Sequence, residues 1–182
     1  MITMDRLLGH LTTRDLVAIA LFACIAKVSG LVIALAGGGM NPLALVLRNA
    51  VVTGLLIVML AKVAGKGVLF LNAVLGGIVS LVLFGHGMML LPGAIIGSIA
   101  GEGAMVIATK YGVRAHLPLV GAACSEISAK LISLCVTYVV LRENPVLLTP
   151  VLFVLGIGCV GTFLGLWGGW RMARELRRAN II

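Results

Sequence analysis

Charged side chains are scarce in this sequence of 182 residues, and acidic ones are the rarest: Lys and Arg number 14, whereas Asp and Glu together number 6. Charged residues make up 11% of the chain and apolar residues 61%. So little polar surface cannot cover the exterior of a soluble fold of this length. The composition therefore predicts that lipid is the solvent for most of the protein surface.

Residues that build metal sites, disulfides and catalytic centres are also few. The four cysteines lie inside apolar segments without the spacing of a metal site, and we interpret them as small packing residues. His10, His86 and His116 lie outside those segments, and no Gly-x-Ser-x-Gly, His-Glu-x-x-His or Walker motif occurs. We expect no metal, no cofactor and no enzymatic activity in this chain, so any ATP hydrolysis would belong to partner subunits.

Long apolar segments, separated by glycine, proline and charge, are what the sequence has in abundance. A membrane-spanning helix needs about 20 largely apolar residues, so six helices with short connections account for the chain. We predict an all-α integral membrane bundle in which residues 1–182 form one domain, and we expect the first helix to be retained rather than cleaved as a signal peptide. The predicted spans are residues 15–36, 43–64, 68–84, 88–108, 117–141 and 147–172.

Lys and Arg are unevenly distributed between the two ends of these predicted helices. Ten of them fall in the terminal segments and loops of one side, and Arg142 is the only one in the loops of the other side. Basic residues collect on the cytoplasmic side of membrane proteins, so both chain termini are predicted to be cytoplasmic. The ten are Arg6, Arg14, Lys62, Lys66, Lys110, Arg114, Arg171, Arg174, Arg177 and Arg178.

Small residues repeat at every fourth position in two of the predicted spans. Such stripes let helix backbones approach closely, which drives association where lipid offers no hydrophobic contrast. Packing inside the bundle is the main interpretation, and contact with a partner subunit is the alternative, above all for a third, less regular stripe in the first span. The stripes are Gly93, Gly97 and Gly101; Gly161, Gly165 and Gly169; and Ala18, Ala26, Gly30 and Ala34.

Away from the ends of the predicted spans there are five charged residues, in positions where an unpaired charge costs several kcal/mol and a functional role is the first hypothesis. Glu126 and Lys130 are four positions apart on one helix face and can pair, and Lys27 lies at a similar depth. A structural salt bridge and a ligand contact both stay open for this cluster. We expect Glu102 to pair with Lys110 or another cation. The five are Lys27, Arg48, Glu102, Glu126 and Lys130.

Arg48 lies near the outer end of the second span, beside Asn49 and shortly after Asn41. Its side chain either reaches to the lipid headgroups or, with the amides, forms a site for an anionic or zwitterionic small molecule. His86 in the next outer loop is either a further contact or a solvated loop histidine. The candidate substrate-binding residues are therefore Asn41, Arg48, Asn49, His86, Glu126 and Lys130.

Six short motifs, in their order and spacing, carry a family resemblance over nearly the whole chain. They are Leu11–Leu16, Asn41–Pro42, Ala61–Gly67, Gly85–Gly87, Tyr111–Gly112 and Arg174–Ile182. Together they resemble the Trep_Strep (MptT) group of substrate-binding S components of energy-coupling factor (ECF) transporters. In that family a small six-helix membrane protein captures a micronutrient, usually a vitamin or a related compound, from outside. It then docks on a T-type membrane subunit that carries two ABC ATPases.

The resemblance implies where ligand and partner bind. Substrate binds in the outer half of the bundle, under the loop that joins the first two helices, where Arg48 and Asn49 lie. Docking uses small residues of the first helix, and where many members have Ala-x-x-x-Ala this chain has Ala20-x-x-x-Cys24 and Ala26-x-x-x-Gly30. The implied docking residues are Ala18, Ala20, Cys24, Ala26, Gly30 and Ala34.

The function that the resemblance implies is substrate capture for an ECF-type ABC importer in a bacterial or archaeal cytoplasmic (inner) membrane. A vitamin-like small molecule, the T-type subunit, two ABC ATPases and the lipid bilayer are the expected partners, and nucleic acid is not. Two alternatives stay open: a non-transporting structural or assembly subunit, and a solitary small-molecule transporter.

Overall fold

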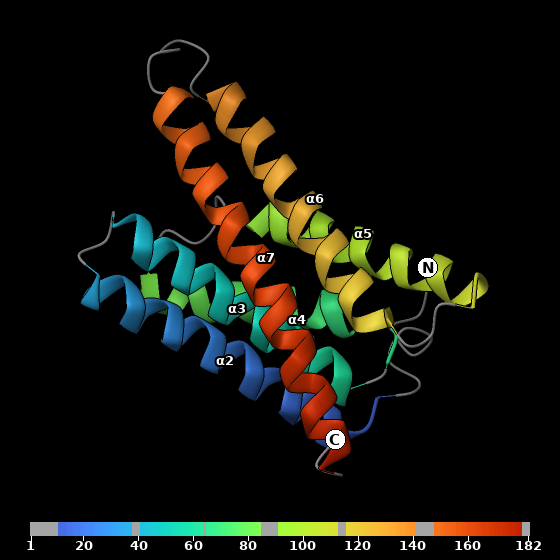
Figure 1. Cartoon of the computed structure of the whole chain (residues 1–182). Helices are drawn as coiled ribbons and strands as arrows, with labels where there is room; N and C mark the ends of the chain where they lie inside the picture. Colours follow the sequence, from blue (N-terminus) through green and yellow to red (C-terminus); the bar gives the residue numbers. More distant parts are fainter. Residues whose placement is uncertain are drawn as a thin grey trace.

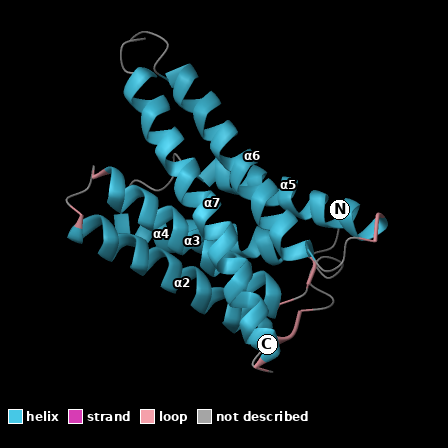
Figure 2. Cartoon of the chain, viewed as in Figure 1, coloured by secondary structure: helices cyan, strands magenta, loops and turns pink. Residues whose placement is uncertain are grey.

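The computed structural model describes residues 11–37, 41–63, 65–84, 91–112, 116–140 and 148–179. Within these ranges the ordered elements are helices, with no strand among them (Figures 1 and 2). The all-α prediction is therefore confirmed for the described residues. The six helices are α2 (Thr13–Ala36), α3 (Pro42–Lys62), α4 (Val68–Phe84), α5 (Leu91–Lys110), α6 (Leu117–Val140) and α7 (Leu148–Arg178).

Five of these helices, α2, α3, α5, α6 and α7, are long and apolar enough to cross a membrane. The shorter α4 has an apolar segment, Val68–Leu83. The last helix differs most from its predicted span, because it continues to Arg178 instead of ending at residue 172. Its added turns consist of Ala, Arg, Glu and Leu, which are good helix formers, and Glu175 pairs with Arg178 at 3.0 Å. The chain is a multi-pass helical membrane protein.

Local hydrogen bonds explain where the first two helices begin. At the start of α2, the Thr12 N–H donates to the Asp15 carboxylate at 2.9 Å, and the Asp15 N–H donates to the Thr12 hydroxyl at 3.3 Å. This reciprocal capping box satisfies two N–H groups that have no acceptor within the helix. At the start of α3, the Asn41 side chain accepts from the Leu43 N–H at 3.0 Å. Pro42 follows at the first helical position, where its missing N–H costs nothing.

The helices associate chiefly as two close pairs, α3 with α7 and α5 with α6. Helix α2 packs on α3 and α4, and α4 in turn packs on α5, which joins the two pairs into one bundle. Figure 1 shows that the first turn of α2 and the last turns of α7 lie at the same end of the bundle. An even number of antiparallel crossings produces this arrangement.

The glycine stripes form the contacts within these close pairs. A Cβ placed on Gly165 of α7 would lie 2.5 Å from the Ala50 carbonyl oxygen and 2.8 Å from the Thr53 Cβ on α3. A Cβ on Gly97 of α5 would lie 2.7 Å from the Ser125 carbonyl oxygen on α6. Real Cβ atoms do not approach so closely, so only glycine fits at these crossings. Packing inside the bundle is therefore confirmed for both stripes.

The carboxylate of Glu102 serves a different purpose from the one predicted. It accepts a hydrogen bond at 3.0 Å from the backbone N–H of Phe70, in the first turn of α4. That N–H has no acceptor within its own helix, and the positive end of the helix dipole favours an anion. The structure describes both Glu102 and Lys110 and records no ion pair between them. The predicted ion pair of Glu102 with Lys110 or another cation is therefore not found among the described residues, where its carboxylate caps the neighbouring helix.

The α3–α7 contact gives a prediction about stability. Gly165→Ala places a methyl group against the backbone of α3, so the helices must separate or bend, and we expect the free energy of unfolding to fall by about 1–3 kcal/mol. Unfolding of the purified protein in mixed micelles, followed by far-UV circular dichroism, measures this change.

Gly168 of the same helix is the matched control, because a Cβ there would meet no heavy atom within 4 Å. Gly168→Ala should leave stability unchanged or raise it by up to about 1 kcal/mol, since alanine is the better helix former. Equal destabilisation by the two substitutions would show that the α3–α7 contact is not as close as described.

Candidate ligand-binding cavity

Two adjoining cavities lie between the helices. The first has a volume of about 370 Å³ and is lined by residues of α2, α3, α4, α5 and α6. The second has a volume of about 380 Å³ and is lined by α2, α3, α6 and α7. Ala26, Lys27, Arg48 and Val52 line both cavities. The two volumes therefore meet at a wall that carries two cationic side chains.

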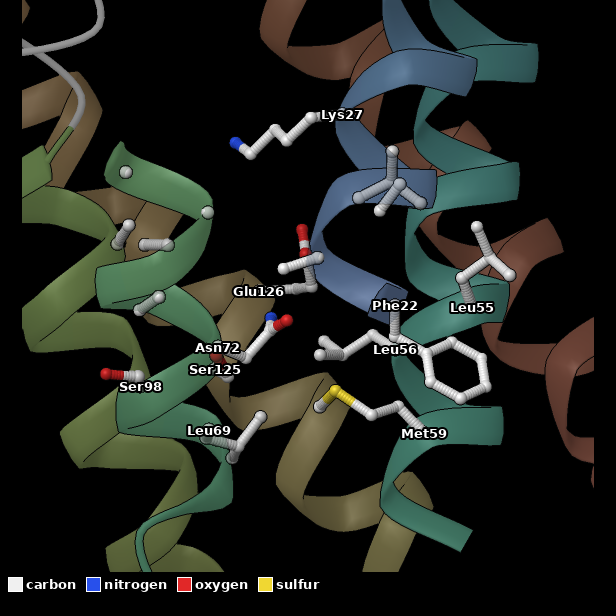
Figure 3. A pocket seen from close by; sticks show the side chains of 18 of the residues that line it. Phe22, Lys27, Leu55, Leu56, Met59, Leu69, Asn72, Ser98, Ser125 and Glu126 are labelled. Carbon is white, nitrogen blue, oxygen red and sulfur yellow. The ribbon is translucent and has the colours of Figure 1, made fainter. Parts of the chain in front are cut away.

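The walls of the first cavity are mostly apolar, with polar groups at a few points. Phe22 and Met59 lie among its apolar residues, and Asn72 and Ser125 among its polar ones. Figure 3 shows the Lys27 side chain extending from α2 across the open space, and Glu126 reaching into the same space from α6. An apolar cavity with a few convergent polar groups is the usual form of a small-molecule site.

Two glycines make room for the cationic side chains. A Cβ on Gly30 would lie 3.3 Å from Nε of Arg48, and a Cβ on Gly76 would lie 3.2 Å from Cε of Lys27. Either distance is shorter than an ordinary contact, so an added Cβ would require the neighbouring cationic side chain to shift by a few tenths of an ångström. The backbones of α2 and α4 thus leave space for side chains that project from neighbouring helices.

Glu126 and Lys130 form the ion pair that their spacing predicts. Nζ of Lys130 donates to the Glu126 carboxylate at 2.8 Å and to the Thr162 hydroxyl at 2.6 Å. The Thr162 hydroxyl in turn donates to the Gly158 carbonyl at 3.1 Å. The Lys130 and Glu126 side chains are 18% and 22% exposed. The pair joins α6 to α7 and is internally neutral.

Lys27 and Arg48 differ from that pair. Among the residues that the structure describes, neither has a carboxylate within salt-bridge distance. Lys27 is half-buried and Arg48 is exposed, but both line the two cavities. At the centre of a bilayer a Lys or Arg costs about 2.5–3.5 kcal/mol on insertion scales unless something neutralises or hydrates it. The cavity wall therefore carries positive charge that this part of the chain does not balance.

The structure brings four of the six predicted substrate-binding residues to the cavities. Arg48 lines both, Glu126 lines the first, and Asn49 and Lys130 line the second. The Nδ2 group of Asn49 also donates to the Leu45 carbonyl at 2.8 Å, one turn earlier on α3. These four residues come from α3 and α6, and α7 contributes through the hydrogen bond between Lys130 and Thr162.

The other two predicted residues are not at the cavities in the described structure. Asn41 is exposed, caps α3 and lines neither cavity. Its amide oxygen is already used by the Leu43 N–H, which explains its place in the Asn41–Pro42 motif without a ligand. His86 lies outside the described residues.

The predicted docking residues of α2 divide into inward and outward positions. Gly30 is buried against Arg48, and Ala26 lines both cavities. Cys24 is exposed, whereas Ala18, Ala20 and Ala34 are half-buried. Cys24 is therefore the member of the set that most fully faces away from the bundle, and the docking role of the set stays a prediction.

Several residues of the site carry little signal in the sequence. Lys27 stands out as an intramembrane charge, yet its place at the junction of the cavities depends on how α2 is rotated. Thr162, Asn72 and Ser98 are small uncharged polar residues of a kind found throughout membrane helices. Thr162 is identified only by its hydrogen bond with Lys130, and Asn72 and Ser98 only by their place in the wall of the first cavity.

The Glu126–Lys130 pair gives a second prediction. Lys130→Met leaves the Glu126 carboxylate half-buried and unpaired, so we expect the free energy of unfolding to fall by about 2 kcal/mol. The double variant Glu126→Gln/Lys130→Met removes both charges and should recover at least half of that loss. A double-mutant cycle on unfolding in mixed micelles measures the coupling.

The exposed pair Glu175–Arg178, whose side chains are 67% and 70% exposed, is the control. Arg178→Met should change stability by less than about 0.5 kcal/mol, because solvent screens that pair. A coupling energy near zero for Glu126 and Lys130 would remove the structural role of their ion pair.

Comparison with known proteins adds no assignment to this cavity. Neither a family model, nor a curated protein, nor a solved structure matches the sequence. What the cavity can bind therefore follows from the chemistry of its own walls.

Proposed function

We propose that this chain is a substrate-capture subunit of an ECF-type ABC importer: it binds a small micronutrient between its helices and performs no chemistry of its own. The observation that carries the proposal is the charged cavity inside a bundle of apolar helices. Lys27 and Arg48 line both cavities, and a charge in the membrane is costly unless it is paired or hydrated. The family resemblance supplies the importer as the setting for such a site.

The distribution of Lys and Arg supports a cytoplasmic location for both chain termini. Arg14 at the start of α2, Lys62 at the end of α3 and Lys110 at the end of α5 lie at the helix ends that share a side in an antiparallel bundle. The last turns of α7 add Arg171, Arg174, Arg177 and Arg178 to that end. With this end in the cytoplasm, as the positive-inside rule favours, the second cavity lies toward the outer side.

In this orientation the second cavity has the location that the resemblance implies for a substrate site. Its walls include Leu45 near the start of α3, Thr137 near the end of α6 and Val154 near the start of α7. These helix ends face outward, so a ligand from outside enters there first. The first cavity continues inward from it past Lys27 and Arg48.

A purely structural subunit is the second candidate, and the large apolar side chains exposed on α2 favour it. Val17, Leu21, Val32 and Leu35 are each more than half exposed, and such a surface suits either lipid or another membrane protein. A scaffold, however, gains nothing from cations that line an internal cavity. Substrate capture accounts for both features, since the importer also needs a docking surface.

The proposal predicts specific partners. When the tagged protein is purified from its native membrane in mild detergent, a T-type membrane subunit and two ABC ATPases should co-purify and be identified by mass spectrometry. Cys24→Phe, at the exposed position of the predicted docking set, should reduce their recovery severalfold because a bulky ring prevents close helix approach.

Val82→Phe is the matched control, because Val82 is 79% exposed on α4, away from the docking set. It should leave the recovery of the partners unchanged. Absence of an ATPase from a preparation in which the protein is abundant and folded would reject the ECF importer and leave the structural subunit or the solitary transporter.

A further inference from the structure

We infer that the ligand of this cavity is a small dianion, a molecule whose two negative charges come from two carboxylates or from one phosphate monoester. Lys27 and Arg48 are its binding cations. The inference rests on the proposed function, in which the cavity is the capture site, and it adds the chemical class of the substrate.

The charge of the cavity walls is the first step. Four charged side chains line the two cavities: Lys27, Arg48, Glu126 and Lys130. Glu126 and Lys130 form an ion pair at 2.8 Å that is neutral overall, and Lys130 also donates a hydrogen bond to Thr162 at 2.6 Å. Two positive charges are left, and the described residues give them no carboxylate partner. A ligand with two negative charges balances the site.

The position of the two cations is the second step. Lys27 projects from α2 and Arg48 from the neighbouring α3, and each lines both cavities. One ligand at the junction can therefore meet both. Coulomb attraction between such groups is several-fold stronger between apolar walls than in water, so a neutral or cationic ligand would leave most of the available binding energy unused.

The space kept for these side chains is the third step. A Cβ on Gly30 would lie 3.3 Å from Nε of Arg48, and a Cβ on Gly76 would lie 3.2 Å from Cε of Lys27. Glycine at both positions leaves space beside two long cationic side chains, of which Lys27 is half-buried and Arg48 is exposed.

The remaining walls suit an organic body on the ligand. The first cavity, of about 370 Å³, falls in the size range of small-molecule sites. Its apolar surface from Phe22 and Leu56 can cover a carbon skeleton, while Asn72 and Ser125 offer hydrogen bonds. The anionic groups then occupy the junction at Lys27 and Arg48.

A series of probes that differ only in charge tests the inference. Succinate, succinamate and succinamide have nearly the same size and carry two, one and no negative charges at neutral pH. Isothermal titration calorimetry with the purified full chain in detergent, at constant ionic strength, measures each dissociation constant. We expect succinate to bind about tenfold more tightly than succinamate, and succinamide to bind weakest, as the loss of one charge-assisted interaction per step requires.

Inorganic phosphate, titrated in the same way, distinguishes the two sources of the dianion. Tighter binding of phosphate than of succinate assigns a phosphate monoester, and the reverse order assigns a dicarboxylate. Equal binding of succinate and succinamide, or no binding of either dianion, overturns the inference.

Single-charge variants show whether the named cations are responsible. Lys27→Gln and Arg48→Gln should each abolish the preference for succinate over succinamate, a change that a merely structural role would not produce. Lys62→Gln, at the exposed end of the same helix as Arg48 and outside both cavities, should keep the preference. Thermal unfolding of each variant verifies that it is folded, and an unchanged preference in both cavity variants overturns the assignment.

The two proposals fail separately. If ATPases and a T-type subunit co-purify but the probes show no preference for two charges, the importer stands and the dianion is rejected. If succinate or phosphate binds as expected but no ATPase is recovered, the dianion site stands and the ECF assignment is rejected.

Discussion

Close contact between helix backbones is the constraint on which the rest of the structure depends. In lipid, apolar side chains gain nothing by leaving the solvent, so helices associate through packing and hydrogen bonds at short range. The glycine stripe of α7 lies directly on α3, with Gly165 facing the Ala50 carbonyl, and that of α5 lies on α6, with Gly97 facing Ser125. These two pairs are fixed by shape, and α2 and α4 fill the space between them. The cavities lie where this packing is least complete.

Glycine therefore has two separate roles in the bundle. In the stripes it lets backbones touch, whereas Gly30 and Gly76 leave room for the side chains of Arg48 and Lys27. Both roles have the same physical basis, the absence of a Cβ, but they have opposite results. The first brings two helices into contact, and the second leaves space beside a helix for a long side chain. Sequence periodicity distinguishes the two roles only in part. Gly30 belongs to a stripe of small residues, yet the side chain of Arg48 from the same protein lies against it.

The parts of this structure that sequence alone predicts are those set by local rules. Helix number, the glycine stripes and the Glu126–Lys130 pair follow from hydropathy, four-residue spacing and chain composition. The rotation of each helix about its axis does not follow from these rules. The lipid-facing and interior-facing sides of the helices are similarly apolar, so the sequence pattern does not distinguish them. That is why Lys27 is recognised as an unusual charge but its location at the junction of the cavities is not.

Two polar residues named in the sequence analysis, Glu102 and Asn41, have structural roles of the same kind. Glu102 caps α4, and Asn41 caps α3, because a helix start presents N–H groups without acceptors and these side chains are within reach. Charged and amide side chains in a membrane protein can thus be needed to satisfy backbone N–H groups, and this role has to be considered before a ligand is invoked. For Asn41 the sequence already contained the signal, since Asn followed by Pro is a common helix start. For Glu102 it did not, because the capped helix lies 32 residues earlier in the chain.

The two cations at the cavity wall differ from the other polar residues of the bundle in this respect. Glu102, Asn41, Glu126 and Lys130 all have partners that account for them within the chain, whereas the described residues supply no carboxylate for Lys27 or Arg48. Replacing a buried charge by an apolar side chain of similar size is often neutral or stabilising. A bundle selected only for packing would therefore lose these two cations readily. Their presence at a shared wall is the feature that the proposed anionic ligand accounts for.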